Sequence, residues 1–181
     1  MRSVAAHGRR AAVAGPGAVN PLAAPPRTPR VKTFVLQRRQ RIDLAAPEAF
    51  AFFAEARNLE AITPPWLAFR VLAPGAIAMR AGTLIDYRLR LHGLPLRWRT
   101  RIAVWEPPRR FVDVQVQGPY ALWEHTHTFE PIGSDAVAIC DRVRYALPLG
   151  PLGRLAHALF VRRDLDRIFA YRARAVEAAL R

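Results

Sequence analysis

The sequence predicts an α+β domain in which a curved antiparallel sheet of seven strands wraps around one long C-terminal helix. A strand and two short helices come first, six strands with short turns follow, and the pattern after Pro148 is helical. Short connections between successive strands require antiparallel pairing, because parallel strands need a long crossover. A single helix cannot fill the concave side of such a sheet, so an internal cavity is expected.

Residues 1–30 differ in composition from the rest of the chain. They hold five arginines, five prolines and three glycines, and they contain no acidic and no aromatic residue. Such a segment buries too little apolar area to offset its ordering entropy, so we predict a disordered tail followed by one domain over residues 31–181. A genuine tail and a start codon assigned too far upstream both fit this composition.

The first part of the domain combines one strand with two small helices. Residues 31–43 alternate in part and predict the first strand. Pro47 marks the start of a helix with aromatic residues at helical spacing. Asn58 is suited to cap a second short helix, and Pro64 and Pro65 end it. These helices are expected to cover the open end of the sheet.

Six further strands and a long helix complete the predicted domain. Alternation and the β-branched and aromatic content predict strands at 66–72, 83–91, 96–105, 111–117, 121–129 and 136–147. After Pro148 the period becomes helical through Arg181. One apolar stripe of this helix is expected to face the sheet, and it comprises Leu155, Leu159, Leu165, Phe169, Val176 and Leu180.

The order of elements and several motifs resemble the helix-grip superfamily called SRPBCC or START-like. The motifs are NLEAITPPWLAFRV, AGTLIDYRL, GPYALWEHTHTF and DRVRYALPLG. The chain is most similar to the bacterial ligand-binding SRPBCC domain proteins, which are polyketide cyclase/dehydrase-like, over residues 31–178. The resemblance implies a fold with an internal apolar cavity, and it carries no particular reaction.

Strand parity identifies the face expected to line the cavity. Trp123, His125, His127 and Phe129 share one face of their strand, because side chains alternate along a strand. Asp141 lies on an otherwise apolar face of the following strand, where a carboxylate requires a partner.

The turn around Gly133 sets the expected pairing of these two strands. A register that keeps both apolar faces together places Phe129 opposite Val137 and His125 opposite Asp141. Such a buried pair has two interpretations. A satisfied polar pair that orients a binding wall is favoured over an acid–base couple in which His125 and Asp141 are catalytic.

The preceding strand has two possible registers. A two-residue loop at Gly118-Pro119 places three valines on the Trp123 face. A one-residue bulge instead places Phe111, Asp113 and Gln115 there and brings Asp113 near His125. The sequence leaves this choice open.

The candidate ligand-binding residues follow from parity and from the helical stripe. They are Tyr87, Trp98, Asp113, Trp123, His125, His127, Phe129, Tyr145 and Phe169. Trp98, Ile102 and Val104 are expected to share a face, and Cys140 is expected to lie on the outer face and to be inert.

His125, His127 and Asp141 have the composition of a two-His-one-carboxylate site. No supporting outer shell is visible, so neither a metal nor another cofactor is predicted.

Charge and cysteine content narrow the function classes. The formal net charge is +14, but no nucleic-acid-binding motif organises the arginines, so solvated strand faces are the favoured explanation. A single cysteine indicates a reducing compartment, the cytoplasm. The sequence contains no run of eighteen apolar residues, so no membrane span is predicted.

We therefore predict binding of a small apolar or amphipathic molecule. The alternatives are a cyclase, dehydratase or hydrolase acting on a carbonyl compound, and an arginine-rich protein of membrane surfaces or RNA. The oligomeric state stays open.

Overall fold

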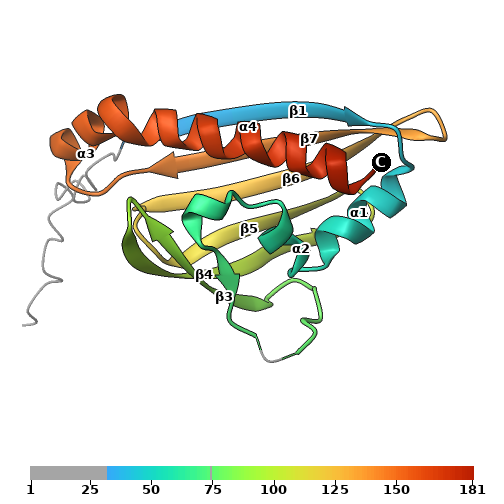
Figure 1. Ribbon diagram of the computed structural model, residues 1–181, viewed down its shortest axis with the longest axis horizontal. Helices are drawn as coiled ribbons and strands as arrows, with labels where there is room; N and C mark the ends of the chain where they lie inside the picture. The colour runs from blue at the N-terminus through green and yellow to red at the C-terminus, as the bar shows by residue number, and fades with distance from the viewer. Residues whose placement is uncertain (1–31, 74) are drawn as a thin grey trace, which may run out of the picture. The chain divides into compact units, whose positions relative to one another are not determined.

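The order of helices and strands is the predicted one (Figure 1). The computed structural model describes residues 32–73 and 75–181, so the prediction of a disordered tail over residues 1–30 lies outside the described residues. The strands are β1 (Phe34–Ile42), β2 (Arg70–Val71), β3 (Leu84–Leu91), β4 (Leu94–Glu106), β5 (Arg110–Gln117), β6 (Leu122–Ile132) and β7 (Ala136–Ala146). The helices are α1 (Ala46–Ala54), α2 (Asn58–Ala61), the 3₁₀ turn η1 (Pro65–Leu67), α3 (Gly150–Ala156), the π turn η2 (His157–Val161) and α4 (Arg162–Ala179).

The seven strands form one antiparallel sheet in the order β1-β7-β6-β5-β4-β3-β2. The sheet curves, and α4 packs on its concave side, where Leu165 and Phe169 contact Leu36 of β1 and Val143 of β7. A two-residue hairpin of type I′ needs positive φ at both loop positions, and His92-Gly93 supplies it between β3 and β4. The predicted α+β helix-grip fold is confirmed. No helix among the described residues is both long and apolar enough to cross a bilayer.

The predicted strand over residues 66–72 is mostly wrong. Pro65 begins η1 instead, with its ring at the first helical position, and Ala68 ends the turn with a φ of 41°. Only Arg70 and Val71 remain to pair with β3.

The predicted apolar stripe of the C-terminal helix is wrong in its first half. Leu155 and Leu159 are 57% and 56% exposed, whereas His157 is buried. A π turn holds more residues than an α turn, so η2 rotates the helix on its N-terminal side relative to α4. After η2 the expected face is buried, with Leu165, Phe169 and Val176 on it.

The β6–β7 hairpin has a register two residues away from the predicted one. Phe129 pairs with Ile139 rather than Val137, and His127 rather than His125 lies opposite Asp141. The turn is centred on Ser134 instead of Gly133, since Ile132 and Ala136 form its closing pair. A shift of two residues preserves side-chain parity, so both apolar faces still point inward.

Two bulges set which side chains of β4 and β5 face inward. The β4–β5 register shifts between Arg99 and Thr100 and again between Ile102 and Val104. The second shift separates Val104 from the inward face of Ile102 and turns Trp105 inward, onto Phe50 at 5.1 Å between ring centroids. The expected shared face of Trp98, Ile102 and Val104 is therefore wrong at Val104.

Candidate functional site

A cavity of about 190 Å³ lies between the concave face of the sheet, α4 and the two short helices. Side chains from α1, α2, β3, β4, β5, β6 and α4 line it, and most of them are apolar. It is partly open to solvent. The pairing of β5 with β6 places a group of polar side chains on one wall of this otherwise apolar space.

Seven of the nine candidate ligand-binding residues line this cavity: Tyr87, Trp98, Asp113, Trp123, His125, His127 and Phe169. Phe129 does not, because its ring packs among aromatic rings of the core, including Phe50 at 5.2 Å. Tyr145 does not line it either. Its hydroxyl lies 2.9 Å from His157 Nε2, at the η2 end of the helix.

Several lining residues were missed by reasoning from the sequence. Phe52 and Phe53 come from α1 and Arg172 from α4. Thr100 is 2% exposed, and its hydroxyl accepts a hydrogen bond from Trp98 Nε1 at 3.0 Å. Its parity with Trp98 was a signal that could have found it. Arg172 sits one turn beyond Phe169, and only the packing of the helix shows that it reaches the cavity edge.

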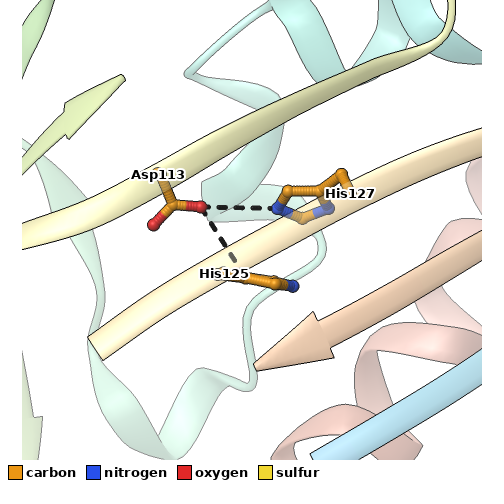
Figure 2. A group of neighbouring side chains, drawn as sticks. All are labelled: Asp113, His125 and His127. Atoms are coloured by element: carbon orange, nitrogen blue, oxygen red, sulfur yellow. Dashed lines mark ion pairs between the residues drawn. The ribbon is translucent and has the colours of Figure 1, made fainter. Parts of the chain in front are cut away.

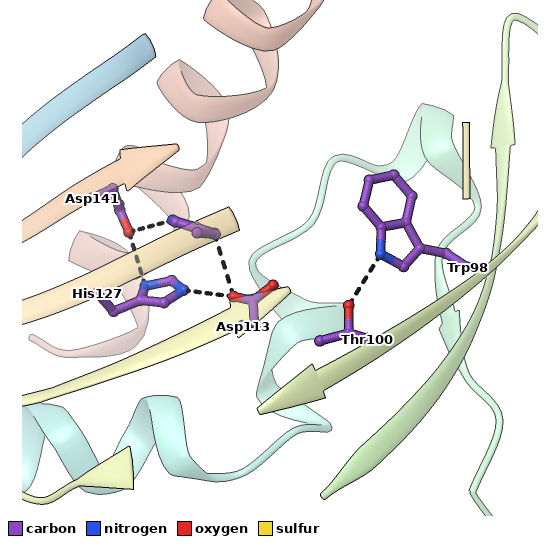
Figure 3. A network of polar contacts seen from close by, with 6 residues as sticks. Trp98, Thr100, Asp113, His127 and Asp141 are labelled. Carbon is purple, nitrogen blue, oxygen red and sulfur yellow. Dashed lines mark hydrogen bonds and ion pairs between the residues drawn. The ribbon is translucent and has the colours of Figure 1, made fainter. Parts of the chain in front are cut away.

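The polar wall is built by β5, β6 and β7. Asp113 lies opposite His125 in the ladder, so the bulged register of residues 111–117 is the one the chain adopts. His127 lies opposite Asp141. Figure 3 shows the His127 imidazole between the carboxylates, with Asp141 on one side and Asp113 on the other. His125 likewise lies between these two carboxylates.

Each imidazole faces both carboxylates with its two nitrogens. His125 Nε2 and Asp141 Oδ1 form a hydrogen bond of 3.0 Å, although the two residues are not directly opposite in the ladder. His127 Nδ1 lies 2.8 Å from the same oxygen, but the oxygen is off the axis of the ring N–H and no aligned hydrogen bond forms. On the cavity side, His125 Nδ1 and His127 Nε2 lie 3.7 Å and 3.5 Å from Asp113 Oδ2 (Figure 2).

The two histidines respond differently to this environment. Burial lowers the pKa of His125, and the neighbouring His127 lowers it further against the pull of Asp141. Burial also opposes charge on His127, but the carboxylates of Asp113 and Asp141 outweigh it and raise the pKa of His127. As the pH falls, His127 therefore takes up a proton before His125 does.

The acidic and phenolic groups of the site are shifted as well. Burial acts to raise the pKa of Asp141, but its contacts with both imidazoles outweigh burial and hold that pKa well below the usual range. Burial and the nearby carboxylate of Asp113 raise the pKa of Tyr87, so its phenol stays protonated. Cys140 lies on the outer face, and partial burial raises the pKa of its thiol, so it has little thiolate character.

Within the part of the chain that the structure describes, one group of side chains has the composition and spacing of a metal site. It consists of Asp113, His125 and His127, whose ligand atoms all lie within 4.8 Å of one another. The carboxylate on the cavity side is thus Asp113, while Asp141 supports the rings from behind.

Comparisons with known proteins concern the fold. No protein-family model matches the sequence, and no curated protein matches it. Norcoclaurine synthase from Thalictrum flavum superposes with a TM-score of 0.60 at 15% identity, over 82% of this chain and 87% of the synthase. A START superfamily protein from Mycobacterium smegmatis superposes with a TM-score of 0.56 at 13% identity, over 81% of this chain and 96% of that protein.

A third similar structure comes from Thermus thermophilus. It has a TM-score of 0.57 at 19% identity, over 80% of this chain and 98% of that chain. At these identities the likeness concerns architecture, and it agrees with the strand order and the long C-terminal helix described above. The chain has the helix-grip fold of the SRPBCC and START-like proteins.

Proposed function

We propose that this protein binds a small, largely apolar molecule in the cavity between the sheet and α4. The observation that carries the proposal is an apolar cavity with one polar wall, made by Asp113, His125 and His127. Ligand sites typically combine an apolar enclosure with a few convergent polar groups that fix orientation.

The dimensions and aromatic walls suit a ring-containing ligand. Cavities of about 150 Å³ are large enough to bind benzene, so about 190 Å³ accommodates one or two rings. Trp98 and Trp123 meet edge to face at 5.2 Å, and Tyr120 lies beside both. Aromatic side chains favour edge and offset contacts with a further ring.

The polar wall selects the other end of the ligand. Asp113 accepts hydrogen bonds, so it suits a hydroxyl or amine on the ligand. Arg172 reaches the cavity edge with its guanidinium 5.4 Å from the Phe169 ring centroid. Among the described residues it forms no ion pair within 4 Å, which leaves it available to a carboxylate or carbonyl oxygen. An aromatic ring carrying a donor and an acceptor is the ligand class that fits best.

Identification of whatever co-purifies with the protein tests the proposal directly. Native mass spectrometry of untagged protein should show a bound molecule of one or two rings. A fluorescent two-ring dye of the naphthol class should bind the emptied protein, and Trp98→Ala should weaken dye binding at least about tenfold, since a buried aromatic contact is lost. Trp66→Ala is the matched control, because Trp66 is 52% exposed and does not line the cavity. Equal effects of the two variants would contradict the proposal.

A second candidate function is acid–base catalysis on a carbonyl compound. The specific observation is the hydrogen bond between His125 and Asp141, which fixes an imidazole whose pKa is lowered beside the cavity. A neutral imidazole held in this way is suited to accept a proton. His125→Ala separates the two functions when binding and turnover of aromatic polyketide mimics are both measured. Loss of a general base lowers turnover about 100-fold or more while binding persists. Loss of a binding contact weakens binding by about 1–3 kcal/mol.

A further inference from the structure

We propose that Asp113, His125 and His127 bind a divalent transition-metal ion of the Zn²⁺ type on the wall of the cavity. This inference goes beyond ligand binding and does not depend on it. Two imidazoles and one carboxylate form a common ligand set for such ions when a coordination position stays open.

The spacing of the three donor atoms supports an ion between them. His125 Nδ1 and His127 Nε2 lie 3.7 Å and 3.5 Å from Asp113 Oδ2 (Figure 2). These separations are too long for hydrogen bonds. With metal–ligand bonds of about 2.0–2.2 Å, the edge of a tetrahedral site is about 3.3–3.6 Å. The three donors lie within 4.8 Å of one another, so closure around an ion needs movements on the order of 1 Å.

Asp141 supplies the outer support that such a site requires. Its Oδ1 lies 3.0 Å from His125 Nε2 and 2.8 Å from His127 Nδ1. A carboxylate behind a metal-binding imidazole holds the N–H on the far nitrogen and orients the ring, and Asp141 forms this hydrogen bond with His125. The other nitrogens of the two rings, His125 Nδ1 and His127 Nε2, lie on the side of Asp113.

This arrangement is unfavourable unless a proton on one imidazole or a metal ion lies between the three groups. Two nitrogen lone pairs and a carboxylate would face one another while both rings are almost fully buried, at 3% and 4% exposure. A divalent ion removes that repulsion, and its charge matches those of Asp113 and Asp141 with both imidazoles neutral. Arg172 does not take this role, because it forms no ion pair with either carboxylate within 4 Å in the described part of the chain.

The open position of the ion faces the cavity. Asp113, His125 and His127 all line it, whereas Asp141 lines a smaller cavity of about 60 Å³ behind the rings. A water molecule or a ligand oxygen would therefore complete the coordination. The chemical class of the ligand atom is a hydroxyl, carboxylate or carbonyl oxygen.

Calorimetric titration of the untagged, chelator-treated full chain with Zn²⁺ tests the proposal. We expect one ion per chain, and we expect Co²⁺ to give the visible absorption of a tetrahedral nitrogen and oxygen site. Asp113→Asn and His127→Gln should weaken Zn²⁺ binding at least about tenfold, and Asp141→Asn should weaken it by about 10–100-fold. Circular dichroism of each metal-free variant reports whether it is folded.

His92→Gln is the matched control. His92 lies on the surface, and its Nε2 is 2.8 Å from Asp164 Oδ2, so it offers another histidine–carboxylate pair outside the cavity. This variant should bind Zn²⁺ with unchanged affinity. Absence of one-to-one binding, or binding that His92→Gln abolishes while Asp113→Asn leaves it intact, would overturn the proposal. Dye binding to the metal-free protein separates this outcome from failure of the ligand-binding function.

Discussion

Asp141 is the residue on which the polar wall depends most. Its carboxylate contacts both imidazoles through a single oxygen, and its side chain is only 19% exposed. Removal of one partner from a buried ionic group leaves the others unsatisfied. Because Asp141 hydrogen-bonds to His125 and lies 2.8 Å from His127 Nδ1, the effect of a change at Asp141 reaches the cavity side of the wall.

Asp141→Asn keeps the shape of the side chain and removes its charge. At neutral pH we expect the free energy of unfolding to fall by about 1–3 kcal/mol, as buried hydrogen-bonding groups lose their partner. The pKa of Asp141 is lowered in the folded state from an ordinary value of 3.8. The stabilisation is therefore fully present above that value and is lost as the pH falls through the folded pKa.

Urea unfolding at several pH values checks this expectation. The difference between wild type and Asp141→Asn should stay constant from about pH 7 to pH 5 and should shrink as the pH falls below about 4. Asp166→Asn serves as control, since Asp166 is an exposed partner of Arg38 and should change stability by less than about 1 kcal/mol. A difference that stays constant below about pH 4 as well would contradict the assignment.

The histidines give a second prediction at the scale of the residue. His127 lowers the pKa of His125 because two positive charges so close together repel one another. Their ring centroids are 3.8 Å apart. In metal-free protein, His127→Gln should therefore raise the pKa of His125, which histidine-selective NMR titration measures directly. A lowered or unchanged value would show that burial alone controls His125.

At the scale of the element, the C-terminal helix carries two different faces. Phe169 is 3% exposed and packs against the sheet and beside His125, at 5.5 Å between ring centroids. Phe160, within η2, is 60% exposed. The π turn is what separates these environments, because it rotates α3 relative to α4.

Phe169→Ala and Phe160→Ala form a matched pair that tests this account. We expect the first to destabilise the protein by about 3–5 kcal/mol, the usual effect of truncating a buried phenylalanine. The second should change stability by less than about 0.5 kcal/mol, as for an exposed position. Chemical denaturation of both variants measures the difference. Comparable losses would mean that Phe160 packs against something in solution.

The same elements show what the sequence could predict. Alternation along β6 predicts that His125 and His127 face inward. This conclusion needs only the pattern of that one strand and no knowledge of which strands pair with it. The pairing of strands was harder to predict. The β6–β7 hairpin is centred on Ser134, so its observed register differs by two residues from the predicted register. The short β2 follows from competition between η1 and strand formation after Pro65. In each case the outcome depends on non-local packing or on loop geometry, which periodicity does not contain.

In the candidate site, too, periodicity along one strand predicted some residues, and others depended on non-local packing. Parity identified the histidine face and left Asp113 as one of two alternatives, and the register of β5 with β6, in which Asp113 pairs with His125, decides between them. Arg172 and Thr100 entered only with the three-dimensional packing of α4 and β4. The π turn could not be read from apolar spacing, because Leu155 and Leu159 continue the expected stripe while pointing to solvent.

At the scale of the whole domain, most arginines in the described part of the chain lie outside the cavity, which Arg172 alone among these arginines lines. Several arginines there form exposed ion pairs, such as Arg99 with Asp86 and Arg110 with Glu106. Exposed pairs contribute little to stability. The sheet, α4 and the short helices therefore hold the domain together by apolar packing, with the buried polar wall as the main electrostatic feature.

This view leads to a prediction for residues 1–30. Their sequence has no aromatic side chain and five prolines, so it offers little apolar area for docking on the domain. We expect a chain that starts at residue 31 to melt within about 2 °C of the full chain, since a change of 1 kcal/mol corresponds to about 2–4 °C at this size. Deletion through residue 43 is the control, because it removes β1 and its pairing with β7, and it should abolish cooperative melting. A loss of several degrees on removal of residues 1–30 alone would show that this segment packs on the domain and contributes apolar contacts that its composition does not suggest.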